Sequence, residues 1–166
     1  LTPDQRYDSM AWVRQHPNLI VARTFSKAYG LAGLRIGYGV AQAALCSRLN
    51  AVRPRFNVTT PAMAAARAAL DDADFLQRTY TLNLAVRSAL AEGLSSEGLT
   101  VRPSAGNFLM VQFPDAPAML AHLRAQGIEV SALAPYGLPS WLRITTGLPE
   151  HNRALLSAVA SGLRPA

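Results

Sequence analysis

The chain has 166 residues and a net charge of +6, with 50% hydrophobic and 16% charged residues. This composition excludes a disordered chain and indicates a globular one that is long enough to bury a core. The arginines are scattered singly, which argues against nucleic acid as a partner, and no apolar run reaches the roughly 18–20 residues of a membrane span. Because no such run is present, we expect a soluble protein. The single cysteine, Cys46, cannot form an internal disulfide, which fits the reducing environment of the cytoplasm.

The first third of the chain has the pattern of an α/β sheet. The run NLIVARTF (18–25) is short, apolar and β-branched, which predicts a strand buried on both faces, as in a parallel sheet. Residues 34–41 predict a second strand, and residues 41–52 predict a helix. Two strands are too few to form a stable sheet alone, so we expect this region to be part of a larger α/β domain.

Two helices are predicted next. Thr59 or Thr60 can cap a helix that begins near Pro61 and runs to an acidic break at residues 71–74. Residues 74–92 then predict an amphipathic helix about 30 Å long, which could link two domains.

The sequence after Gly98 predicts a small α+β unit. Two strands flank the turn PSAG (103–106), and a helix, a short strand, a further strand and a final helix follow. We therefore predict two domains. Residues 1–72 are the end of a large α/β domain, and residues 73–166 are a linking helix with a small C-terminal domain.

Lys27 is the only lysine in a chain with fifteen arginines. A lysine amine can lose its proton and attack a carbonyl, which an arginine cannot do. Thr24 and Ser26 place hydroxyls beside Lys27, and Arg35 follows eight residues later. Guanidinium and hydroxyl groups bind phosphate oxygens, so this set suits a ligand with both a carbonyl and a phosphate, such as pyridoxal 5′-phosphate.

The segment TFSKAYGLAGLRIGY (24–38) resembles the lysine segment of fold-type I pyridoxal-phosphate enzymes of class I/II, specifically the histidinol-phosphate aminotransferase group. The resemblance continues through VRPRFNVTTPAMAAARAAL, SAGNFLMVQF and YGLPSWLRITTGLPEHNRALL, and covers nearly the whole chain in the family's order. It implies pyridoxal 5′-phosphate as cofactor and a small amino donor and a 2-oxo acid as reactants. It also implies transamination as the reaction and a homodimer as the complete protein.

The resemblance assigns roles to individual residues. Lys27 matches the lysine that binds the cofactor aldehyde and moves the substrate proton. Ser26 and Arg35 match ligands of the cofactor phosphate, and Thr24 is a weaker candidate. Arg143 in WLRITTG matches the arginine that holds the substrate carboxylate. The histidines lack metal-ligand spacing, so no metal is expected.

The chain also departs from the family pattern. Family members often have an arginine for the substrate phosphate where this chain has Ser131, which leaves the substrate open. The family's upstream segments, including the Asp that pairs with the pyridinium nitrogen, have no counterpart in this sequence. We therefore expect the carboxyl-terminal half of an aminotransferase, and little or no turnover from the isolated 166 residues.

Two other functions are consistent with the sequence. Similar sequences act as pyridoxal-phosphate-dependent decarboxylases of phosphorylated amino acids. Others are sensor domains fused to a winged-helix module in transcription regulators.

Overall fold

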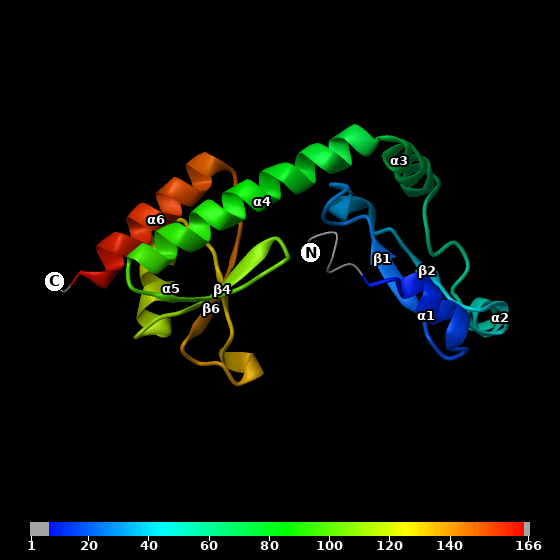
Figure 1. Cartoon of the computed structure of the whole chain (residues 1–166), viewed down its shortest axis with the longest axis horizontal. Coiled ribbons are helices and arrows are strands. Elements are labelled where there is room, and N and C mark those ends of the chain that lie inside the picture. The colour runs from blue at the N-terminus through cyan, green and yellow to red at the C-terminus, as the bar shows by residue number, and fades with distance from the viewer. Residues whose placement is uncertain (1–6, 165–166) are drawn as a thin grey trace. The chain divides into compact units, whose positions relative to one another are not determined.

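The computed structural model describes residues 7–164. The chain divides into two compact units, Leu1–Tyr80 and Thr81–Ala166, and the division falls within the long helix α4 (Ala73–Ser96) (Figure 1). Within the described residues, every helix is too short or too polar to cross a membrane.

The first unit contains a two-stranded antiparallel ribbon and several helices. Its described elements before α4 are, in chain order, α1 (Ser9–Gln15), β1 (Val21–Thr24), η2 (Ala32–Leu34), β2 (Gly37–Val40), α2 (Ala43–Val52) and α3 (Thr60–Asp71). Val21 pairs with Val40 and Thr24 pairs with Gly37, so the ribbon is in register from end to end.

The expectation of a parallel strand buried on both faces at residues 18–25 is wrong for this chain. β1 is antiparallel to β2, and three of its four residues are exposed. The physical reason is that an apolar run indicates which faces of a strand are nonpolar. It does not indicate the direction of the neighbouring strand or what covers those faces.

The predicted helices of the middle region are confirmed. Thr59 caps α3 by accepting a hydrogen bond from the backbone N–H of Ala62, and Pro61 lies in the first turn. Asp72 then accepts from the backbone N–H of Phe75 at 2.9 Å, which begins α4. α4 has 24 residues and is longer than predicted, about 36 Å at the usual rise per residue.

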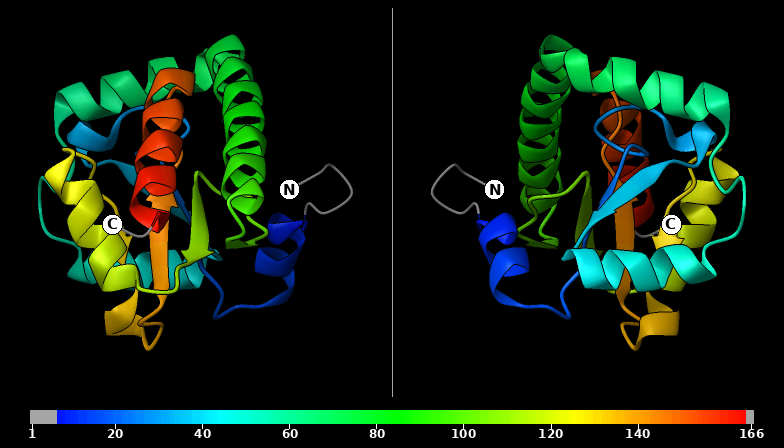
Figure 2. Two further views of the ribbon diagram at one scale, coloured as in Figure 1. Left: turned by 90° about the vertical axis from the view of Figure 1, so that its left-hand side faces the viewer. Right: turned by 90° about the vertical axis from the view of Figure 1, so that its right-hand side faces the viewer.

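The second unit combines helices with one antiparallel sheet. After α4 its elements are β3 (Thr100–Arg102), β4 (Phe108–Gln112), α5 (Ala116–Ala125), β5 (Ser131–Ala132), η3 (Ala134–Tyr136), β6 (Trp141–Thr145) and α6 (Pro149–Leu163). The strands form one antiparallel sheet in the order β3-β4-β6-β5. α4 and α6 run alongside each other (Figures 1 and 2), and buried Asn152 of α6 donates a hydrogen bond to the carbonyl of Val86 in α4.

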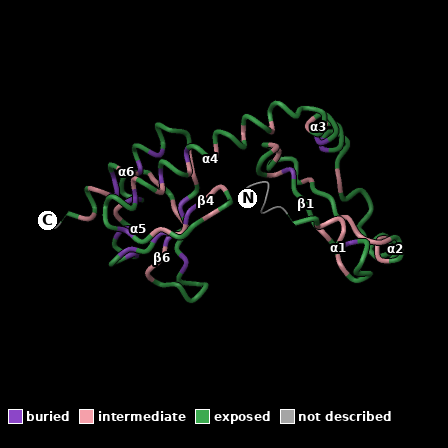
Figure 3. The backbone as a smooth tube through the Cα atoms, in the orientation of Figure 1, coloured by how far each residue is buried: buried purple, intermediate pink, exposed green. Residues whose placement is uncertain are grey.

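The core of the second unit lies between one face of the sheet and the helices (Figure 3). Alternate residues of β4 and β6 point into it and are at most 2% exposed: Leu109, Val111, Leu142 and Ile144. Leucines of α4 and α5 pack against them: Leu90, Leu94 and Leu123. The residues between these strand positions are partly or fully exposed, so the sheet has a core face and an open face.

Gly37 is required by the close approach of β1 and β2. A β-carbon at this position would lie 2.6 Å from the backbone oxygen of Arg23, whereas nothing lies within 4 Å of one at Gly33. We expect Gly37→Ala to force the strands apart and to lower the free energy of unfolding by about 1–3 kcal/mol. Gly33→Ala should be neutral or slightly stabilising. Thermal denaturation of both variants checks this, and equal stability would contradict the geometry.

Candidate active site

The candidate site of the first unit is the connection between β1 and β2, and Phe25 holds this connection together. Its side chain is 3% exposed, and its ring centroid lies 4.9 Å from that of Tyr29 and 5.8 Å from that of Tyr38. The backbone N–H of Phe25 donates to the carbonyl of Ile36, and its own carbonyl accepts from Leu31. Both ends of the connection are thereby joined.

Lys27 lies two residues after this anchor, in a turn. Its carbonyl accepts a hydrogen bond from Gly30, which has a φ of 69° that favours glycine. The side chain of Lys27 is exposed, and within residues 7–164 it has no hydrogen bond or ion pair. The amine is therefore accessible to a ligand.

The two hydroxyls beside Lys27 lie close together. The backbone N–H of Ser26 donates to Oγ1 of Thr24 at 3.0 Å, which fixes the turn that leaves β1. Ser26 is partly buried, whereas Thr24 is exposed. Each hydroxyl can still donate its own proton to an anion.

Arg35 has an unusual backbone conformation. Its φ is 51° and its ψ is 50°, a left-handed geometry that few residues other than glycine adopt. Its Nη1 donates to the carbonyl of Ala32 at 2.7 Å, which restrains the exposed side chain. The guanidinium has five N–H donors, so most of them stay available. Such backbone strain is common at ligand sites.

The structure brings four of the five predicted site residues to one end of the ribbon. Thr24 closes β1, and Ser26, Lys27 and Arg35 lie on the connection that follows it. The fifth residue, Arg143, belongs to the second unit.

Arg143 lies on the open face of the second unit's sheet. It pairs with Met110 of β4 and with Ser131 of β5. Its Nη2 donates to Oγ of Ser131 at 3.3 Å, and its guanidinium carbon lies 5.5 Å from the centre of the Phe108 ring. These contacts hold an exposed cation in a defined orientation.

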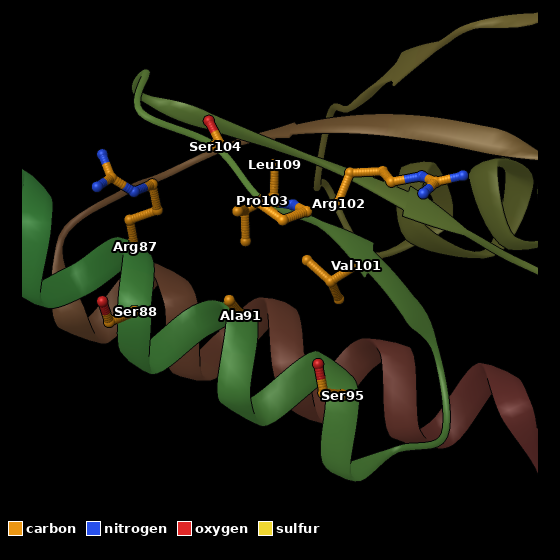
Figure 4. Close-up of a pocket in the computed structure, with 9 residues that line it drawn as sticks. All are labelled: Arg87, Ser88, Ala91, Ser95, Val101, Arg102, Pro103, Ser104 and Leu109. Atoms are coloured by element: carbon orange, nitrogen blue, oxygen red, sulfur yellow. The ribbon is translucent and has the colours of Figure 1, made fainter. Parts of the chain in front are cut away.

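A pocket of about 290 Å³ in the second unit contains none of the predicted site residues (Figure 4). It lies between α4 and the β3–β4 hairpin. Arg87 at its edge donates to the carbonyl of Gly106 at 2.7 Å, so its guanidinium supports the hairpin turn.

Two aromatic residues that support predicted site residues, one in each unit, were not identified from the sequence. Phe25 and Phe108 have no chemical group that indicates a functional role. Phe25 could have been found only as the last apolar residue of the run before Lys27. Successive residues of a strand point to opposite faces. This geometry is the only signal in residues 108–112 that Phe108 shares a face with Met110 and Gln112.

Comparisons with known proteins agree with the family resemblance found in the sequence. The family model for aminotransferase class I and II matches residues 2–159. Histidinol-phosphate aminotransferase 2 of Ralstonia nicotianae is 52% identical over 171 residues, which cover 100% of this chain and 46% of that protein.

Solved structures resemble the chain in fold. Histidinol-phosphate aminotransferase from Sinorhizobium meliloti, in complex with pyridoxal-5′-phosphate, matches with a TM-score of 0.81 and 35% identity over 88% of this chain and 41% of that one. L-threonine-O-3-phosphate decarboxylase from Porphyromonas gingivalis matches with a TM-score of 0.80 and 27% identity over 92% of this chain and 49% of that one. The expected fold, a part of the fold-type I aminotransferase architecture, is confirmed.

The chain spans less than half the length of the curated relatives that it matches. The family match nevertheless covers almost every residue of the chain itself. The chain belongs to the aminotransferase class I and II family.

Proposed function

We propose that this chain supplies the lysine-bearing part of a pyridoxal-phosphate-dependent aminotransferase, which passes an amino group from an amino acid or amine to a 2-oxo acid. The observation that carries the proposal is the accessible amine of Lys27 on the same connection as Ser26 and Arg35. The Sinorhizobium meliloti relative, solved with pyridoxal-5′-phosphate, supports the choice of cofactor. In the complete protein, residues 1–72 would belong to the large domain and residues 73–166 to the small one.

The residues of the connection fit this cofactor. Lys27 would hold the aldehyde through Nζ. Ser26 and Arg35 would hold the phosphate, since a hydroxyl and a restrained guanidinium are suitable donors to its oxygens. Thr24 is a weaker candidate because Oγ1 already accepts from the backbone of Ser26. When bound, pyridoxal 5′-phosphate supplies an electron sink for the negative charge that develops at the substrate α-carbon.

Lys27 would also move the substrate proton. A lysine amine acts as nucleophile or base only in its neutral form, and arginine cannot replace it in either task. Nζ of Lys27 is free to act as a base only after the amino group of the donor replaces it at the aldehyde, and it would then take the proton from the α-carbon of the donor. The anchor at Phe25 and the turn at Gly30 limit where this amine can reach.

Arg143 would bind the substrate carboxylate. A guanidinium holds a carboxylate through two parallel hydrogen bonds, which orients the bonds at the α-carbon. The contacts of Arg143 with Ser131 and Phe108 reduce the conformational freedom that binding would otherwise remove.

We also propose that the complete protein is a homodimer of the cytoplasm. Large apolar side chains are exposed in the first unit, including Val52 at 79%, Phe56 at 94% and Leu70 at 56%. Exposed apolar surface of this kind is typical of surfaces that pack against further protein.

A second candidate function is decarboxylation of a phosphorylated amino acid. The similarity to the Porphyromonas gingivalis decarboxylase favours it. The two reactions differ in the bond that breaks at the α-carbon, so product analysis distinguishes them. Aminotransfer converts the donor into a carbonyl compound, which is a keto acid when the donor is an amino acid, whereas decarboxylation releases carbon dioxide.

The test of the function uses a chimera in which this chain replaces the matching segment of the Ralstonia nicotianae relative. We expect the chimera to transfer amino groups to a 2-oxo acid without releasing carbon dioxide. Lys27→Ala and Lys27→Arg should each lower the rate about a hundredfold or more, because the proton-transfer group is lost. A chimera that releases carbon dioxide instead, or that keeps its rate in both variants, would contradict the proposal.

Arg35 is expected to act on cofactor affinity. In the same chimera, Arg35→Gln should raise the dissociation constant for pyridoxal 5′-phosphate about tenfold, since one charge-assisted pair of hydrogen bonds is lost. Equilibrium dialysis measures this constant. Arg48→Gln, which changes an exposed arginine of α2, is the matched control and should have no effect. Equal affinities in the two variants would exclude Arg35 as a phosphate ligand.

A further inference from the structure

The open face of the second unit's sheet carries a second arginine besides Arg143. The strand register puts four residues in one row across the sheet, in the order Arg102, Met110, Arg143 and Ser131. Directly paired residues project to the same face, so both arginines point away from the core. Their Cα atoms are two strand spacings apart, or about 10 Å.

Both arginines are held over aromatic rings. The guanidinium carbon of Arg102 lies 5.4 Å from the ring centre of Trp141, and that of Arg143 lies 5.5 Å from the ring centre of Phe108. Arg102 is on β3 and Trp141 is on β6, so the side chain of Arg102 crosses β4. Figure 4 shows Arg102 extending along the sheet rather than toward α4. Trp141 precedes Arg143 by two residues, which brings the Arg102 guanidinium to the strand that carries Arg143.

Neither cation has an acidic partner among residues 81–164. In the part of the chain that the structure describes, Arg102 and Arg143 form no ion pair, whereas Arg124 pairs with Glu129 at 3.2 Å. A guanidinium within about 6 Å of a ring centre is attracted to the ring, and its N–H groups can still donate to an anion. The open face therefore presents two oriented anion-binding groups.

We propose that Arg102 is a second anion-binding residue, which together with Arg143 selects ligands that carry two anionic groups. The first group is the carboxylate that Arg143 binds, so this inference rests on the proposed function. The second is a carboxylate or a phosphate several bonds away, held by Arg102 above Trp141. Arg102 is in this way a specificity residue for the substrate.

The test measures ligand binding by the 166-residue chain, with the indole N–H of Trp141 as a local reporter in heteronuclear NMR. Butyrate carries one anionic group, glutarate adds a distal carboxylate, and 3-phosphonopropionate adds a distal phosphonate. We expect both dianions to bind about tenfold more tightly than butyrate. Comparison of glutarate with 3-phosphonopropionate identifies which distal group is preferred.

Variants separate the two arginines. Arg102→Gln should abolish the preference for dianions and leave butyrate affinity unchanged, and Arg102→Lys should retain part of the preference because it keeps the charge. Arg143→Gln should weaken all three ligands. Arg124→Gln is the control and should change none.

Two results would overturn the proposal. The first is a wild-type chain without any preference for dianions, including one that binds none of the three ligands. The second is a preference that persists in Arg102→Gln. These results differ from those expected if only the proposed function is wrong. In that case the chimera would not transfer amino groups, but anion binding by the 166-residue chain would still depend on Arg102.

Discussion

The candidate active site depends on the burial of one aromatic side chain, Phe25. Its ring packs against Tyr29 and Tyr38, and its backbone bonds to both arms of the β1–β2 connection. Ordering an exposed loop costs conformational entropy for every residue, and a buried ring offsets part of this cost. The position of Lys27, two residues further along the chain, follows from this anchor. Gly37 contributes by allowing the two strands to approach each other closely.

The two units contribute different chemistry. The first unit carries the exposed amine of Lys27 on the same connection as hydroxyl and guanidinium groups, the kinds of group that suit an aldehyde and a phosphate. The second unit provides a sheet whose core face is covered by helices and whose open face carries two arginines over aromatic rings. This separation follows from strand geometry, because successive residues point to opposite faces. A short antiparallel sheet can therefore stabilise its unit with one face and leave the side chains of the other face exposed for the proposed binding of anions.

Much of this arrangement could be predicted from the sequence, and the remainder depends on tertiary contacts. The cap at Thr59, the α+β order of the second unit and the grouping of Ser26, Lys27 and Arg35 follow from local signals. The direction of β1 does not, because its apolar run is compatible with either pairing. The short helix α1 (Ser9–Gln15) was not predicted, because seven residues give little periodicity. The position of Arg102 over the ring of Trp141 depends on a register between distant strands, which a single sequence does not specify.

The proposed function requires that Lys27 is the amine that holds the cofactor. The most direct measurement treats the chimera with pyridoxal 5′-phosphate, reduces it with borohydride, and locates the attached cofactor by peptide mass spectrometry. We expect attachment on the peptide that contains Lys27, the only lysine that this chain contributes. We expect none at this segment in Lys27→Arg. Attachment at another amine, at an unchanged level in Lys27→Arg, would contradict the claim.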